Sequence, residues 1–502
     1  MRKSLRFWSL GIIYLFLFLL TACSKDDTDQ YSDSEIVARV GDRIITKSEF
    51  IMRAEYTPRP AYCRRDNYVH KKIILNSLIA EKLLALDLQS NSEYMTPPRF
   101  EEYLTGRKEQ AMRQLHRYEN GIKKASPSSE MLNRGLRNAR REYQVAYFTL
   151  PDSTQLPLLA SKLAQNSTFE SLSFELTRQS VLPQRTVSWF DDDERAIREA
   201  IYSQPLERDS ILKPIKLKDG SFIMLKILGW EDTYSLSESA NQTLWEDVVS
   251  KVETRLGSQL YIEYVSNMMS GKSFKFEKET FRLFVEDLAN IYMLKDAQKE
   301  SIINEVIWDI EKQHLSYGDL QQDVQYLDQV LFTFEGDSWT VKDLFEQIAK
   351  HPLVYRNTKF PMSEFPNEVR MAVADLLRDI SITEEAYASD YGDRIEVKTQ
   401  LQMWQDHYLA DVYKRLIKAS TTVNNSNPNE FIETHLNPVV DKLQEQYSSQ
   451  IFINFDLFDS VDLTSIDMFV TQEQVAYPIM VPSFPQIYTD HKFDYGNKFE
   501  TQ

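Results

Sequence analysis

Residues 36–50, IVARVGDRIITKSEF, contain the pattern from which the architecture of the chain can be worked out. Apolar residues alternate on either side of Gly41-Asp42, which is typical of two antiparallel strands joined by a two-residue turn. Thr46 and Glu49 follow at the spacing of a capping box, which marks the start of a helix. We therefore expect a β-hairpin followed directly by a helix. Apolar residues at helical spacing predict further helices over 67–90 and 99–124.

The same order of elements recurs far downstream. Thr46 and Thr340, at the two expected helix starts, are 294 residues apart, and the ends of the two segments keep the same spacing. The second hairpin turn is expected at Gly336-Asp337. Because both ends of the segments match, the sequence predicts two related helical units. Each unit is expected to close on a strand of its own, residues 274–277 in the first and 451–455 in the second.

Residues 141–232 interrupt the first unit with a different pattern. Short alternating runs typical of strands are mixed with runs of helical spacing. This order indicates a compact domain with an antiparallel sheet and helices packed on it. The predicted fold class is therefore α+β, a mainly helical body of two related units with an inserted antiparallel-sheet domain. The expected elements are strands over 143–150, 212–215 and 221–228 and helices over 158–165, 169–180 and 196–202.

The N-terminal residues have the pattern of an export signal. A basic start precedes an apolar run over residues 7–22, which is too short to span a bilayer as a mature helix. The run ends in Leu20-Thr21-Ala22-Cys23, which resembles the bacterial lipobox. Residues 1–22 are therefore expected to be a lipoprotein signal peptide and Cys23 the lipidated residue. An ordinary signal peptide with a coincidental cysteine is the alternative.

Removal of residues 1–22 takes away three cations and no acids, so the formal net charge falls from -17 to -20. The polar and acidic residues 23–35 are expected to form a tether that holds the body away from a membrane. The expected location is the bacterial cell envelope, lipid-anchored in the outer membrane and facing the periplasm. An acidic tract directly after the cysteine resembles the surface-export signal of some Gram-negative lipoproteins, so surface exposure is the alternative.

The opening VARVGDRIITKSEF, the helix ILNSLIAEKLLALDL and the order of elements in 141–232 resemble the SurA/PrsA class of extracytoplasmic folding factors. Proteins of this class carry parvulin-type, PpiC-like peptidyl-prolyl cis-trans isomerase domains on a helical chaperone body. The resemblance covers residues 36–290 best. Residues 325–465 are included only because they repeat the order of elements of the first unit. It implies a protein-folding factor with no cofactor, whose partners are unfolded or nascent envelope proteins and a membrane reached through Cys23.

The resemblance also indicates where an isomerase site would lie. Parvulin sites place one histidine in the first strand and one in the last, and these positions fall on Tyr147 and Phe222. No histidine occurs between His116 and His314, so the inserted domain cannot form that pair. The isomerase site is therefore expected to be degenerate.

Prolyl isomerisation twists a tertiary amide and breaks no bond, so an apolar pocket could assist it without histidines. The candidate substrate-binding residues are Trp189, Phe190 and Met224, together with Tyr147 and Phe222. The alternative is that these are alternate core positions of a small sheet. Three functions stay open: a non-catalytic chaperone, an isomerase with an unorthodox pocket, or a surface lipoprotein that binds cargo.

Composition and motifs argue against other classes of protein. The acidic balance without a basic patch argues against nucleic-acid binding. No HExxH, GxSxG, GxxxxGKS or GxGxxG motif and no paired metal-ligand spacing occur, so no metal site is expected. Cys63 would be a lone thiol in the mature chain and is expected to be packed or idle.

These patterns divide the chain into eight segments. The tail is rich in proline and aromatic residues, and it either wraps the body as an extended segment or stays mobile. The segments are the signal peptide 1–22, the tether 23–35, the N-terminal helical unit 36–140, the parvulin-like domain 141–232, the returning helix and closing strand 233–290, a helical connector 291–324, the second helical unit 325–465 and the tail 466–502.

Overall fold

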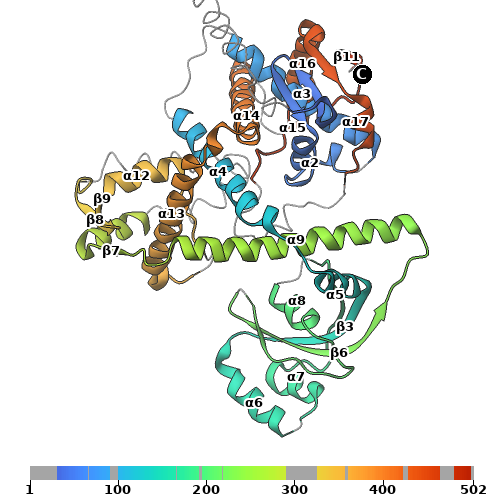
Figure 1. Ribbon diagram of the computed structural model, residues 1–502, viewed down its shortest axis with the longest axis vertical. Coiled ribbons are helices and arrows are strands. Elements are labelled where there is room, and N and C mark those ends of the chain that lie inside the picture. Colours follow the sequence, from blue (N-terminus) through green and yellow to red (C-terminus); the bar gives the residue numbers. More distant parts are fainter. Residues whose placement is uncertain are drawn as a thin grey trace, which may run out of the picture. The chain divides into compact units, whose positions relative to one another are not determined.

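The computed structural model describes residues 31–65, 67–90, 100–165, 167–191, 195–217, 219–289, 325–356, 360–421, 428–463 and 480–498 (Figure 1). Cys23, the predicted signal peptide 1–22 and the predicted connector 291–324 lie outside the described residues. The chain divides into a terminal unit, Met1–Arg113 with Thr383–Gln502, and a central unit, Gln114–Ile382. Within the described ranges, no helix has the length and apolar character that crossing a membrane requires.

The sheet of the terminal unit combines strands from both ends of the chain. β1 (Ile36–Val40) and β2 (Arg43–Thr46) form the predicted hairpin, with Gly41 at a φ of 62° in the turn. β10 (Ile451–Ile453) lies antiparallel to β1, and β11 (Asn497–Lys498) lies parallel to β10. The strand order is β11-β10-β1-β2, so the C-terminal residues complete the sheet that the N-terminal hairpin begins.

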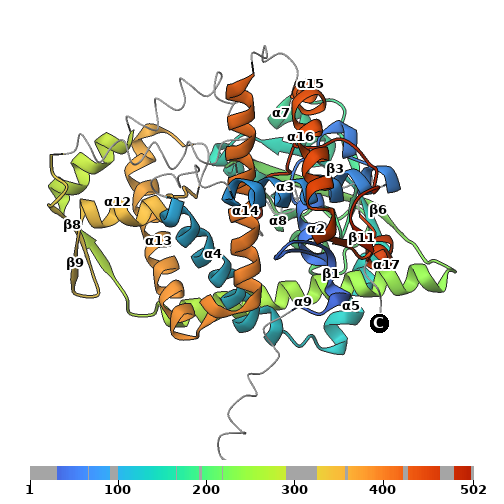
Figure 2. The ribbon, with the colours of Figure 1, turned by 90° about the horizontal axis from the view of Figure 1, so that it is seen from above.

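The first helix begins where the capping pattern predicts. The Thr46 side chain accepts a hydrogen bond from the backbone N–H of Glu49 at 3.0 Å, which starts α2 (Lys47–Glu55). α3 (Tyr68–Ser90) is buried over most of its surface and forms the centre of the unit. It lies beside α14 (Ile395–Ser420; Figure 2). The other helices are α4 (Phe100–Asn120), which continues into the central unit, α15 (Pro428–Phe431), α16 (Asn437–Gln446) and α17 (Phe455–Ser460).

The described part of the tail, residues 480–498, contains no helix and one short strand, β11, and it packs within the terminal unit. Phe484 is buried in the core of this unit. The Asn76 side chain of α3 donates hydrogen bonds to the carbonyl oxygens of Asp490 and Lys492 at 2.8 and 2.9 Å. Of the two alternatives for the tail, wrapping therefore applies to these residues.

A second hairpin in the central unit repeats the first. β8 (Val330–Phe334), β9 (Asp337–Thr340) and α12 (Val341–Lys350) begin 294 residues after β1, β2 and α2, and a complete capping box starts α12. The turn falls on Glu335-Gly336, one residue before the predicted Gly336-Asp337. Both turn residues have a positive φ, 53° and 97°, as a two-residue hairpin turn requires, while Asp337 pairs with Phe334 in the ladder.

The prediction that each unit closes on its own strand is wrong. β7 (Phe274–Phe276) follows the first hairpin along the chain but pairs with β8 of the second hairpin, and Phe276 lies opposite Phe332. β10 pairs with β1 instead, so that Ile453 lies opposite Ala38. The residues that meet are aromatic in one sheet and aliphatic in the other, and such matched cross-strand pairs stabilise a sheet.

The inserted domain has the predicted elements in the predicted order, together with an edge strand, Gln184–Ser188, that was not predicted. Its sheet is antiparallel with the order β4-β3-β6-β5. The long central strands are β3 (Arg141–Leu150) and β6 (Phe222–Asp232), and the edges are β4 (Gln184–Ser188) and β5 (Ile215–Lys216). The α+β fold class is confirmed. Within its described residues, the central unit also contains α5 (Ser129–Arg140), α6 (Leu156–Ala164), α7 (Phe169–Thr177), α8 (Arg195–Tyr202), α9 (Glu238–Met268) and α13 (Phe365–Ala388), which continues into the terminal unit.

Candidate functional site

The sheet of the inserted domain separates two hydrophobic cores. Val145 and Tyr147 of β3 point to the face that α8 and α9 cover. Phe148 and Leu150 point to the face that α6 and α7 cover. This alternation follows from the two-residue period of a strand. Each face of the sheet is therefore packed against helices.

Tyr147 and Phe222, the two positions at which the sequence resemblance places the parvulin histidines, lie on opposite faces of this sheet. Tyr147 packs on the α8 and α9 side, and the guanidinium of Arg185 lies 5.6 Å from the centre of its ring. Phe222 lies opposite Leu150 in the ladder and packs on the α6 and α7 side. The two side chains do not face each other, so the alternative of one pocket that both of them line does not apply.

The other candidate residues are divided between the two sides of the sheet. Met224 is fully buried in the core under α6 and α7. Trp189 is 7% exposed and belongs to the opposite core, whereas Phe190 is 38% exposed. Of the two alternatives for these residues, the pocket that all of them would line is therefore not formed. The alternative of core positions holds for Trp189 and Met224, because the small sheet needs both side chains to fill its two interiors.

Phe190 lies at a corner that α9 holds in place. The rings of Trp189 and Phe190 pack edge to face with centroids 5.1 Å apart. Lys251 of α9 places its Nζ 4.9 and 5.1 Å from the two ring centres and donates a hydrogen bond to the Trp189 carbonyl oxygen at 2.6 Å. Because a cation of the protein already lies over both rings, we interpret this corner as a joint between the sheet domain and α9.

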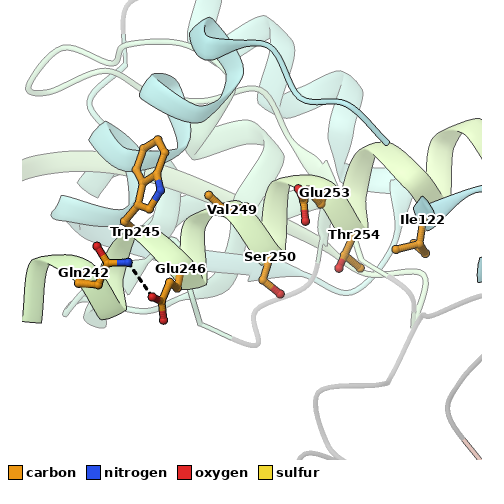
Figure 3. A pocket seen from close by; sticks show the side chains of 8 residues that line it. All are labelled: Ile122, Gln242, Trp245, Glu246, Val249, Ser250, Glu253 and Thr254. Carbon is orange, nitrogen blue, oxygen red and sulfur yellow. Dashed lines mark hydrogen bonds between the residues drawn. The ribbon is translucent and has the colours of Figure 1, made fainter. Parts of the chain in front are cut away.

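A groove with a volume of about 410 Å³ follows the first half of α9 (Figure 3). Trp245 and Val249 give it apolar surface, and Glu246 and Glu253 give it two carboxylates. Ile122 lies at one end of the groove. The remaining lining residues are polar and uncharged: Gln242, whose Nε2 donates to Glu246 at 2.7 Å, Ser250 and Thr254.

Two glycines hold Ile122 against α9. A Cβ on Gly257 would lie 2.6 Å from Ile122 Cα, and a Cβ on Gly121 would lie 2.6 Å from the Gly257 carbonyl oxygen. No real Cβ fits at such distances, so the two backbones meet directly only because both residues are glycine. The end of the groove is therefore fixed by backbone packing.

This groove is not among the features predicted from the sequence. The signal was present, because Trp245, Val249 and Glu253 are spaced four residues apart and so lie on one side of a helix. Such a spacing is shared by many surface helices, and only the packed structure shows that this side of α9 lines an open groove.

Two side chains of reactive types, His116 and Cys63, are buried. His116 is buried and shares a hydrogen bond of 3.0 Å with the Tyr261 hydroxyl. Burial raises the pKa of the Cys63 thiol to about 12, although the nearby charge of Arg59 opposes this shift, so the thiol is protonated at neutral pH. Among the described residues, no group of three or more His, Cys, Asp or Glu side chains could hold a metal ion.

No family model and no curated protein matches the sequence. The solved structures that match part of it include three PrsA proteins. These are the foldase protein PrsA from Streptococcus pneumoniae, at 10% identity and a TM-score of 0.20, the peptidylprolyl isomerase PrsA from Bacillus cereus, at 12% and 0.19, and PrsA from Bacillus subtilis, at 13% and 0.16. Each match covers 46% of this chain and 90%, 93% and 93% of the other chains, respectively. With TM-scores of this size, neither fold nor function is inferred from these matches.

Proposed function

We propose that the chain is a lipid-anchored protein-folding factor of the cell envelope, of the SurA/PrsA class, that binds unfolded chains and does not catalyse prolyl isomerisation. One observation carries the non-catalytic part of the proposal. The sequence resemblance places the parvulin histidine positions at Tyr147 and Phe222, and these two side chains pack on opposite faces of the sheet. Two side chains that act together on one substrate must share a face.

We also propose that the two helical segments are related units. Three successive elements, a strand, its hairpin partner and the helix that follows, begin 294 residues apart in the two segments. In each segment a threonine caps that helix. In this proposal the two segments form the helical body on which the inserted domain is mounted.

Exposed apolar side chains would provide the contact with unfolded chains. In the central unit, Val181 is 80% exposed, Tyr234 67% and Leu236 fully exposed. Binding of many different clients needs apolar contact with little shape selection. The predicted charge of -20 for the mature chain would keep such complexes in solution.

Lipidation of Cys23 in the outer membrane is proposed from the sequence pattern. A clickable fatty-acid analogue fed to cells that produce the chain should label the wild type. The variant Cys23→Ser should remain unlabelled and should leave the membrane fraction. Equal labelling of both proteins would contradict this anchor.

Refolding of a protein that is limited by proline isomerisation tests binding and catalysis together. At equimolar amounts the chain should reduce aggregation of this substrate, while the rate constant of the slow phase should keep its uncatalysed value. Acceleration of the slow phase by small amounts of the chain would instead favour an isomerase with an unorthodox pocket. If the chain changes neither aggregation nor the rate of the slow phase, this result would favour a surface lipoprotein that binds cargo.

A further inference from the structure

We propose that the α9 groove, lined by Trp245, Val249, Glu246, Glu253 and Ile122, binds extended segments in which two cationic side chains flank an apolar one. This inference rests on the proposed function, since it names the chemistry of the unfolded chains that the protein would hold. It assigns this binding to the groove side of α9 and not to the sheet of the inserted domain.

The apolar part of the groove is open to a ligand. Val248 and Val252 of α9 enter the core of the inserted domain. Trp245 is not a member of that core and is 36% exposed, and Val249 beside it is half-buried. A half-exposed tryptophan next to an aliphatic side chain can bury a large apolar area when a partner covers it, and tryptophan is enriched among the residues that dominate binding energy.

Two carboxylates define the charge of the groove. Glu246 and Glu253 are seven residues apart on α9, which at 1.5 Å per residue separates them by about 10 Å along the axis. Neither forms an ion pair with a lysine or arginine of the described residues, although other carboxylates of this unit do, such as Glu199 with Arg255 at 3.2 Å. The groove therefore offers negative charge that a cationic ligand can neutralise.

The cations at the Ile122 end are already engaged. Lys123 forms an ion pair with Glu119 at 2.8 Å. Lys124 donates a hydrogen bond to the Asn120 side chain at 2.8 Å. These contacts leave the acidic stretch between Glu246 and Glu253 as the part of the groove that selects a ligand by charge.

The dimensions favour an extended peptide. The lining of α9 runs from Gln242 to Thr254, about 18 Å of helix, which about six extended residues cover at 3.3 Å per residue. About three extended residues span the distance between the two carboxylates. A segment with lysines or arginines three or four positions apart and an apolar residue between them would match both the charges and the apolar floor.

Titration of the full mature chain with labelled, unstructured Gly/Ser peptides tests this inference. The first peptide contains Lys-Leu-Ser-Lys, the second Glu-Leu-Ser-Glu and the third Lys-Ser-Ser-Lys. The first should bind most tightly, and its affinity should fall as salt is added. The double variant Glu246→Gln with Glu253→Gln should weaken its binding about fivefold at low salt, and Trp245→Ala about tenfold.

A matched control changes the same net charge elsewhere on α9. Asp247 and Glu263 are exposed and do not line the groove, so Asp247→Asn with Glu263→Gln should bind the first peptide like the wild type. Equal binding by the two double variants would overturn the inference. Equal binding of the three peptides to the wild type, without salt dependence, would overturn it independently of whether the variants fold.

Suppression of aggregation by the wild type separates this inference from the function it rests on. If the wild type suppresses aggregation of an unfolded protein and the groove variants keep peptide binding, the groove assignment fails and the folding function stands. If the wild type does neither, both fail. A third outcome is that the groove variants bind the peptides like the wild type but sediment differently in the absence of peptide. In that case a second copy of the chain occupies the groove, and the peptide assignment is wrong.

Discussion

Replacement of Glu81 by glutamine should destabilise the terminal unit by about 3–5 kcal/mol, because it leaves a buried arginine without its counter-charge. Arg53 and Glu81 are both fully buried and are joined by two hydrogen bonds of 2.7 and 2.8 Å. Glutamine keeps the shape of the side chain and removes its charge. The Arg53 guanidinium would then remain in the interior, and one of its N–H groups would face the NH2 group of the glutamine instead of a carboxylate oxygen.

The neighbouring charges favour the upper part of this range. Lys82 lies 2.9 Å from Glu49 and 3.1 Å from Asp406, and Arg43 lies 2.8 Å from the same Asp406 carboxylate. With the Arg53 and Glu81 pair, these residues form a buried network of three cations and three carboxylates. Loss of one carboxylate leaves an excess positive charge that no other buried group of this network neutralises.

The same pair makes the unit sensitive to acid. Burial alone would raise the pKa of Glu81, but the charge and hydrogen bonds of Arg53, helped by His407, hold this pKa well below its usual range. A carboxylate whose pKa is lowered on folding stabilises the fold above its unfolded pKa of about 4.3, and this contribution is lost as the pH falls below it. Stability of the wild type should therefore fall in this acidic range, and that of Glu81→Gln should fall less.

Thermal unfolding combined with hydrogen exchange measures the effect. The midpoint of the terminal unit should fall by about 10 °C for a domain of this size, and amides of α3 should exchange faster. Glu445→Gln, at an exposed position of α16 in the same unit, is the control and should change neither value. If the two variants unfold at the same temperature and α3 exchanges equally in both, the reasoning about the buried pair is refuted.

Three further predictions concern packing and reactivity. Gly257→Ala should destabilise the central unit by about 1–3 kcal/mol, because its Cβ would meet the Ile122 backbone. The control Gly229→Ala should have a small effect, because its Cβ would meet only the end of the flexible Arg208 side chain. Similar melting points of the two variants would contradict the described packing of Gly257. Met224→Ala should cost about 2–5 kcal/mol by leaving a cavity in the core, measured by denaturant unfolding, and a change below about 1 kcal/mol would count against the described packing. Cys63 should react with a thiol reagent at neutral pH only after denaturation, and fast labelling of the native protein would be inconsistent with its burial.

Short-range features of the fold could be predicted from the sequence, because they depend on residues a few positions apart. The turn at Gly41 and the cap at Thr46 are local devices, and the order of strands and helices in 141–232 follows from periodicity and turn residues. The closing strands could not be assigned in this way. An alternating segment such as Phe274–Phe276 is suited to several sheet edges, and its choice of β8 depends on contacts with residues about 60 positions away.

The candidate site was harder to predict for a related reason. A shift of one residue moves a side chain to the other face of a sheet, so the positions of Tyr147 and Phe222 along their strands did not determine whether they share a pocket. Methionine is common on binding surfaces, but Met224 is buried because α6 and α7 cover its face of the sheet. The groove near Trp245 is visible only when α9 is placed against its neighbours.

The central claim is that the chain holds unfolded envelope proteins. The most direct measurement is light scattering from an unfolded outer-membrane protein diluted out of denaturant, with and without the mature chain. At stoichiometric amounts the chain should lower the scattering, and the effect should increase with its concentration. Unchanged aggregation at a clear stoichiometric excess of folded chain would contradict the account.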